Sequence, residues 1–86
     1  MPHLLAKLSN VPIKFIREIL EKDKEFHASQ GMYLENVWQN TDNEKEVFFL
    51  FKIDSTEKTK VLIDKLHAQA LVENPEANLP TMIYLE

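Results

Sequence analysis

Four stretches of the chain have the two-residue period of β-strands. In some of them apolar and polar residues alternate, and in others both alternating sets are apolar. They are Leu4–Leu8, Met32–Gln39, Glu46–Ile53 and Thr81–Leu85. Successive side chains of a strand point to opposite faces of its sheet. The stretch Glu46–Ile53 carries large apolar residues in both sets, which is typical of a strand buried on both faces. We therefore expect it to be central in the sheet.

Two longer segments have the period of an α-helix. Between Pro12 and Ser29 the apolar residues fall within an arc of about 160° when each residue turns by about 100°. These residues are Ile13, Phe15, Ile16, Ile19, Leu20 and Phe26. Pro12 suits a first helical turn, and Gly31 stands where a glycine cap would end the helix.

The second helix is expected to begin after Asp54, because Asp54 and Glu57 have the spacing of a capping box. It runs to about Ala70 or Val72. Its apolar stripe consists of Leu62, Ile63, Leu66 and Ala70.

The order of strand, helix, strand, strand, helix, strand predicts an α+β fold in one domain over residues 1–86. Short connections and right-handed crossovers favour a ferredoxin-like β-α-β-β-α-β sandwich, a four-stranded antiparallel sheet with two helices on one face. The face toward the helices is expected to carry Leu4, Ala6, Leu8, Val47, Phe49, Phe51, Ile53, Ile83 and Leu85.

The opposite face of this sheet is also apolar. It is expected to carry Leu5, Phe48, Leu50, Met82 and Tyr84, with Tyr33 and Val37 if the second strand keeps its alternation. Its polar residues would be His3, Lys7, Glu35 and Lys52, with Glu35 paired to Lys7 or Lys52. Monomeric proteins seldom expose so large an apolar patch, so we expect a second copy of the chain to cover it.

Three segments carry a resemblance to a known group of proteins: Pro2–Leu8, Gly31–Asp54 and Leu79–Glu86. Their strand and turn pattern resembles the dimeric α/β-barrel superfamily, which includes antibiotic-biosynthesis-monooxygenase-like and stress-responsive barrel domains. The resemblance spans nearly the whole chain. It implies two subunits whose sheets form a shared barrel, with a small cavity between sheet and helices in each subunit.

The composition of the chain argues against several classes of function and does not identify one. The formal charge of −4 argues against binding to nucleic acid or to an anionic membrane surface. The absence of cysteine excludes thiolate catalysis and cysteine-ligated metals, and a single glycine excludes glycine-rich phosphate loops. No signal-peptide pattern opens the sequence and no apolar run approaches about 20 residues, so a cytoplasmic protein is expected.

Asp23 and His27 form the first candidate pair for chemistry, because residues four apart share one helix face. Both fall inside the apolar arc, where a carboxylate could orient the imidazole as a general base. The alternative is a local pair at the helix end. Two such ligands fall short of a catalytic zinc site, so no metal is expected.

Trp38, Asn36 and His67 form a second candidate set, with Tyr33 beside them on the strand. Some haem-degrading members of the superfamily use an Asn, a Trp and a helical His. In those enzymes the tryptophan lies on the third strand, whereas Trp38 lies on the second, so their roles are not carried over. The alternative is that Trp38 packs under a helix and His67 lies half-exposed.

Three functions follow as hypotheses. The first is a homodimeric module of unassigned role that binds a small, largely apolar ligand between sheet and helices, without a cofactor. The second is a cofactor-independent monooxygenase or isomerase acting on a small aromatic or polyketide-like compound, with His27, Tyr33, Asn36 and Trp38 lining its pocket. A weaker third is haem binding through His27 or His67.

Overall fold

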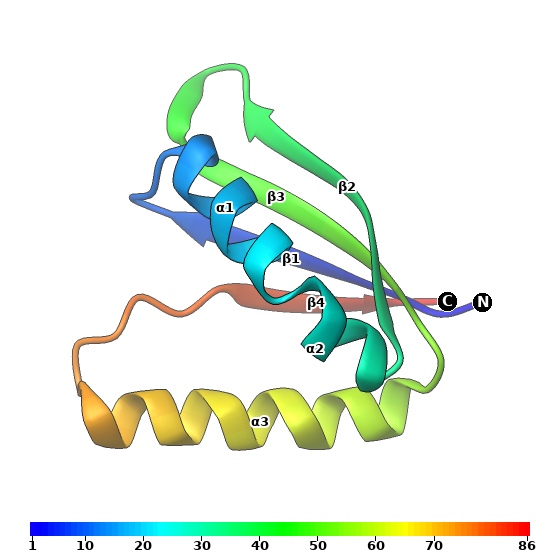
Figure 1. Cartoon of the computed structure of the whole chain (residues 1–86). Helices are drawn as coiled ribbons and strands as arrows, with labels where there is room; N and C mark the ends of the chain where they lie inside the picture. The colour runs from blue at the N-terminus through cyan, green and yellow to red at the C-terminus, as the bar shows by residue number, and fades with distance from the viewer.

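The computed structural model describes residues 1–86 as four strands and three helices (Figure 1). In chain order they are β1 (His3–Ser9), α1 (Ile13–Lys22), α2 (Lys24–Ser29), β2 (Met32–Asn40), β3 (Asn43–Ile53), α3 (Thr56–Glu73) and β4 (Thr81–Leu85). None of the three helices is both long enough and apolar enough to cross a membrane.

The four strands form one antiparallel sheet in the order β2-β3-β1-β4. The long strand β3 is central, as its two apolar sets predicted, and β2 and β4 are the edges. A two-residue turn, Thr41–Asp42, joins β2 to β3. This α+β arrangement is compatible with a ferredoxin-like fold.

The segment predicted as one helix is two helices, separated at Asp23. Asp23 has φ −95° and ψ 7°, close to but outside the helical region, and serves as the C-cap of α1 and the N-cap of α2. Gly31 has φ 75°, which confirms the predicted left-handed cap. A Cβ at Gly31 would lie 2.9 Å from Asp54 Oδ2, so a larger residue would also have to displace the Asp54 carboxylate.

Helix α3 is capped by Ser55 and not by Asp54. The Ser55 hydroxyl oxygen accepts a hydrogen bond from the backbone N–H of Lys58 at 3.2 Å. The predicted capping box was therefore one residue out of register, and the helix extends to Glu73.

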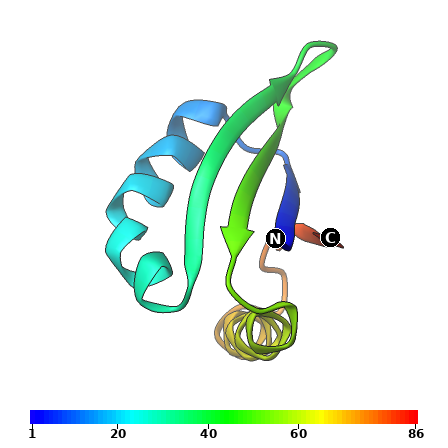
Figure 2. The same cartoon turned by 90° about the vertical axis from the view of Figure 1, so that its right-hand side faces the viewer.

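One buried cluster joins the sheet to α1 and α3. It consists of Leu4, Ala6, Leu8, Ile16, Leu20, Met32, Val47, Phe49, Phe51, Ile53 and Ile63. Helix α1 contributes Ile16 and Leu20, whereas α3 contributes only Ile63, with Thr59 buried beside it. Figure 2 shows α1 and α2 beside the β2 side of the sheet and α3 below, well separated from α1. Helix α3 is therefore packed less firmly against the sheet than α1.

The predicted faces of β4 were wrong. Leu4 lies opposite Tyr84 and Ala6 opposite Met82, and residues opposed in an antiparallel pair share a face. Met82 and Tyr84 therefore lie on the helix side, and Ile83 and Leu85 on the other. Both alternating sets of this short strand are apolar, so only its register with β1 could decide between them.

The predicted alternation of β2 is broken by a bulge at Glu35. Leu34 pairs with Phe51, whereas Asn36 pairs with Leu50, so Glu35 is an extra residue. Tyr33 lies on the open side as predicted, but beyond the bulge Val37 turns to the helix side. Trp38 turns to the open side opposite Phe48, so it does not pack under a helix.

Candidate functional site

The side of the sheet away from the helices is an apolar surface that crosses all four strands. We call it the open face; its apolar members are Leu5, Tyr33, Trp38, Phe48, Leu50, Ile83 and Leu85. Trp38 is 45% exposed and Ile83 and Leu85 are each 42% exposed, while Leu5, Phe48 and Leu50 are half-buried. An apolar surface of this extent usually marks an interaction site.

The charged residues of the open face are mostly paired within the chain. His3 Nε2 lies 2.8 Å from Glu35 Oε1, so the bulge residue reaches across β3 to β1. This contact replaces the predicted pairing of Glu35 with Lys7 or Lys52. Lys52 has no acidic side chain within ion-pair distance. The paired charges leave the centre of the face to apolar side chains.

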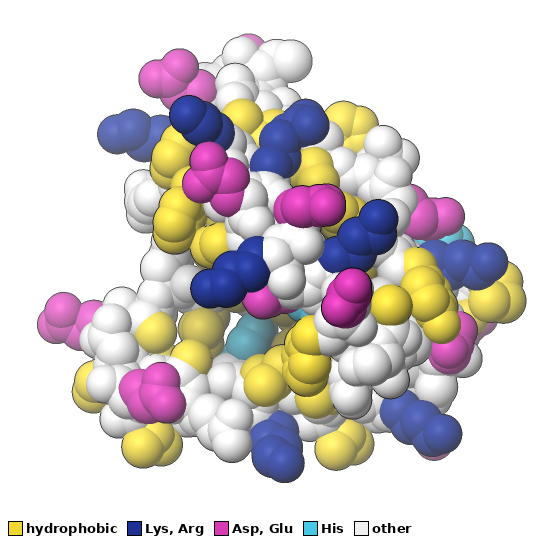
Figure 3. Space-filling view, viewed as in Figure 1, with side chains coloured by type: hydrophobic (Ala, Val, Ile, Leu, Met, Phe, Trp, Pro, Cys, Tyr) yellow, Lys and Arg dark blue, Asp and Glu magenta, His cyan; other side chains and the backbone are white.

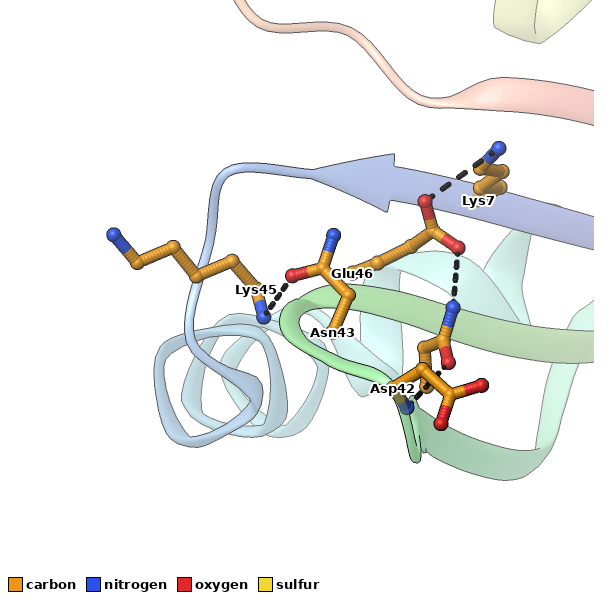
Figure 4. A network of polar contacts seen from close by, with 6 residues as sticks. Lys7, Asp42, Asn43, Lys45 and Glu46 are labelled. Carbon is orange, nitrogen blue, oxygen red and sulfur yellow. Dashed lines mark hydrogen bonds and ion pairs between the residues drawn. The ribbon is translucent and has the colours of Figure 1, made fainter.

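Glu46 joins the open face to the hairpin turn (Figure 4). Its carboxylate lies 3.6 Å from Lys7 Nζ through Oε2, and its Oε1 accepts a hydrogen bond of 2.9 Å from Asn40 Nδ2. Asn40 Oδ1 in turn accepts a hydrogen bond from the backbone N–H of Asp42 at 2.8 Å. These contacts fix the end of β2, where its register with β3 shifts again.

A small cavity lies on the other side of the sheet, between the helices α1 and α2 and the strands β2 and β3. Its volume is about 210 Å³, and we call it the His27 cavity. Its lining residues are Leu20, Glu21, Lys24, His27, Ala28, Met32, Tyr33, Leu34 and Phe51. Ligand pockets commonly measure about 300–1,000 Å³, so this cavity suits a small molecule only.

His27 supplies the imidazole in this cavity. Its ring meets the edge of Phe51 at 5.1 Å between centroids and lies 5.9 Å from the ring of Phe26. Burial lowers the pKa of His27 below 6.5, and the negative charge of Asp23 opposes that shift only partly. His27 is therefore a neutral imidazole at pH 7, able to donate one hydrogen bond and accept another.

The predicted Asp23–His27 side-chain pair does not form. The only hydrogen bond between these residues joins the backbone N–H of His27 to the backbone carbonyl of Asp23 at 2.9 Å. Asp23 lies at the break between α1 and α2, which takes its side chain out of the regular spacing of one helix face. No carboxylate orients the imidazole, so a relay from Asp23 has no support.

The predicted ligand-binding residues lie in three places. His27 and Tyr33 line the same cavity, although the register of the edge strand β2 places Tyr33 on the open side, so Tyr33 borders both surfaces. The Tyr33 hydroxyl donates a hydrogen bond of 3.4 Å to Asp54 Oδ2. Asn36 and Trp38 lie on the open face, across the sheet. His67 is half-buried on α3.

Five apolar residues of the cavity wall were not predicted as site residues: Leu20, Ala28, Met32, Leu34 and Phe51. The helical arc did identify Leu20 as facing inward, and alternation placed Phe51 on the helix side. Alternation along β2, with Tyr33 on the open side, likewise placed Leu34 on the helix side. No group of three or more His, Asp or Glu side chains is arranged to hold a metal ion.

Comparison with known proteins gives no assignment: no family model matches the chain, and no curated protein matches it.

Proposed function

We propose that the chain is a homodimeric α/β module in which the open faces of two copies pack against each other. The observation that carries this proposal is the contiguous apolar surface over all four strands, from Trp38 on β2 to Ile83 on β4. Two polar pairs of this surface, His3–Glu35 and Lys7–Glu46, are satisfied within the chain, and Lys52 is the one charged side chain left without an acidic partner. A partner with an apolar and nearly uncharged surface therefore fits best.

A second copy of the chain meets that requirement without further assumptions. A twofold axis places the same patch on both partners, so an apolar centre meets an apolar centre. Nucleic acid would require cationic side chains along the surface, and the formal charge of the chain is −4. Two sheets joined in this way would form the shared barrel of the superfamily that the sequence resembles.

Trp38 gives a direct test, because it is the only tryptophan and lies on the open face. In a dimer its indole is shielded by the partner. Dilution should therefore shift its emission to longer wavelength and increase its quenching by acrylamide, while circular dichroism shows that the chain stays folded. Emission and quenching that stay constant across the dilution series, at the values of a solvent-exposed indole, would contradict the proposal.

We further propose that each subunit binds a small apolar molecule in the His27 cavity. The observation that favours this function is a neutral imidazole set among apolar side chains. The same group could serve as the general base of a cofactor-independent monooxygenase or isomerase, so binding and catalysis would share this site. Haem is not proposed, because a cavity of about 210 Å³ is too small for it.

Indole is a suitable probe of this cavity, with proton NMR titration of His27 as the readout. Filling the cavity should remove more water from the imidazole and lower the pKa of His27 further. The half-buried His67 on α3 lies outside the lining of the cavity and is the internal control, because indole should leave its resonances in place. If saturating indole leaves the resonances of His27 unchanged, the cavity binds no such molecule, and both the ligand-binding and the catalytic proposals fail.

A further inference from the structure

Another cavity lies where α2 ends and α3 begins, and it shares no lining residue with the His27 cavity. Its volume is about 380 Å³, within the range of about 300–1,000 Å³ that is common for ligand pockets. We call it the Thr59 cavity; its lining residues are Ser29, Gln30, Gly31, Asp54, Ser55, Lys58, Thr59 and Leu62. Figure 3 shows side chains of both charges, with hydrophobic ones between them, around this corner of the molecule at the lower right.

One face of α3 supplies the floor of this cavity. It consists of Ser55, Lys58, Thr59 and Leu62. Residues three or four apart are neighbours on a helix surface, so these side chains share one face. The Ser55 hydroxyl oxygen accepts the capping bond from the backbone N–H of Lys58 at 3.2 Å, and its own proton stays free to donate. The floor also lies at the N-terminal end of an 18-residue helix, which carries a positive partial charge.

Thr59 indicates that this cavity is built to hold a polar ligand. Its side chain is only 2% exposed, yet it takes part in none of the side-chain hydrogen bonds of the chain. No fully enclosed polar side-chain atom lacks a hydrogen-bond partner, so the small exposed area of Thr59 includes its hydroxyl. Because Thr59 lines the cavity, that hydroxyl opens into it. A nearly buried hydroxyl without a partner is costly, and a polar ligand would supply the partner.

A second wall of the cavity carries a carboxylate that the backbone holds in place. The backbone N–H of Asp54 donates to the carbonyl of Gly31 at 3.0 Å, and Asp54 Oδ2 accepts the Tyr33 hydroxyl at 3.4 Å. Gly31 leaves room for this carboxylate, because a Cβ there would lie 2.9 Å from Asp54 Oδ2. Neither Asp54 nor Lys58 belongs to the two ion pairs of the chain. The cavity therefore offers both a carboxylate and an ammonium group to a ligand.

This combination favours a ligand that carries both charges. A simple anion would be attracted by Lys58 but repelled by Asp54, and a metal cation would be repelled by Lys58. A molecule with one carboxylate and one ammonium group satisfies both side chains, and its carboxylate can also accept the proton of the Thr59 hydroxyl. Leu62 is half-buried against the buried cluster and offers an apolar contact. We infer that the Thr59 cavity binds a free amino acid with a small apolar side chain, its carboxylate toward Lys58 and Thr59 and its ammonium toward Asp54.

This inference is independent of the proposed dimer and of the His27 cavity. L-Valine is the probe, and NMR titration measures its affinity through the amide resonances of Gly31 and Thr59. L-Valinamide lacks the carboxylate and N-acetyl-L-valine lacks the ammonium group, so each should bind at least about tenfold more weakly than L-valine. Equal affinity for L-valine and either analogue would overturn the proposal, because the cavity would then recognise only one charge. Unchanged amide resonances of Gly31 and Thr59 at high L-valine concentration would also overturn it.

Two variants test the side chains that carry the inference. Thr59→Val keeps the shape of the side chain and removes only the hydroxyl, and Lys58→Gln removes the charge at an exposed position, so that variant should fold. Each should weaken L-valine binding by at least about tenfold. Lys65→Gln is the matched control, because Lys65 is an exposed cation on the same helix outside this cavity; its affinity should equal that of the wild type. The same affinity in Thr59→Val, Lys58→Gln and Lys65→Gln would refute the site.

Discussion

Replacing Leu50 by Glu is expected to hold the chain in its monomeric form. Leu50 lies on the central strand β3, paired with Leu5 on β1 and Asn36 on β2, so it occupies the middle of the open face. In a twofold dimer each copy would bring one unpaired carboxylate into an apolar interface, which is costly. In the monomer Leu50 is only half-buried, so a glutamate there can reach water.

Thermal unfolding at several protein concentrations measures this effect. The Tm of a dimer rises with concentration, because association stabilises the folded chain by mass action. The wild type should show this rise and Leu50→Glu should not. Val61→Glu is the matched control, since Val61 is 70% exposed on α3, away from the open face. The proposed interface would be refuted if all three proteins had Tm values independent of concentration.

Replacing Phe51 by Ala is expected to lower the free energy of unfolding by about 3–5 kcal/mol. That is a large part of the total for a typical domain, which is roughly 5–15 kcal/mol. Phe51 is 2% exposed and forms the floor of the His27 cavity. Its ring meets Phe49 at 5.9 Å and His27 at 5.1 Å between centroids, both edge-on. Truncation would remove these contacts and enlarge the cavity.

The Phe51→Ala variant is also expected to change a property of the cavity, namely the pKa of His27. Water admitted beside His27 should raise its pKa from the lowered value back toward 6.5. Stability is measured by urea denaturation at one protein concentration, with Phe15→Ala as control. Phe15 is 51% exposed, so its truncation should cost about 1 kcal/mol or less. Equal losses for the two variants would contradict the assignment of Phe51 to the core.

The faces of the two inner strands could be predicted. Leu4, Ala6 and Leu8 on β1, and Val47, Phe49, Phe51 and Ile53 on β3, are buried as alternation required. The edge strands could not be assigned in this way. On β4 both sets are apolar, so Ile83 and Met82 could not be distinguished until the register with β1 was known.

The bulge at Glu35 shows why the candidate site was only partly predictable. Nothing in the sequence of β2 indicates an extra residue, yet it moves Val37 and Trp38 to opposite faces from those expected. His27 was identified correctly as inward-facing, because helical spacing reports which side of a helix is apolar. Its partnership with Asp23 was wrong, because a helix break depends on packing as well as spacing.

The most direct test of the proposed assembly is the mass of the wild-type protein in solution, by light scattering on a sizing column. The chain has a mass of 10.1 kDa. Two copies joined through their open faces should elute with twice that mass, and Leu50→Glu should elute with the mass of one chain. A wild-type protein that elutes with the mass of one chain at every concentration would contradict the proposed dimer.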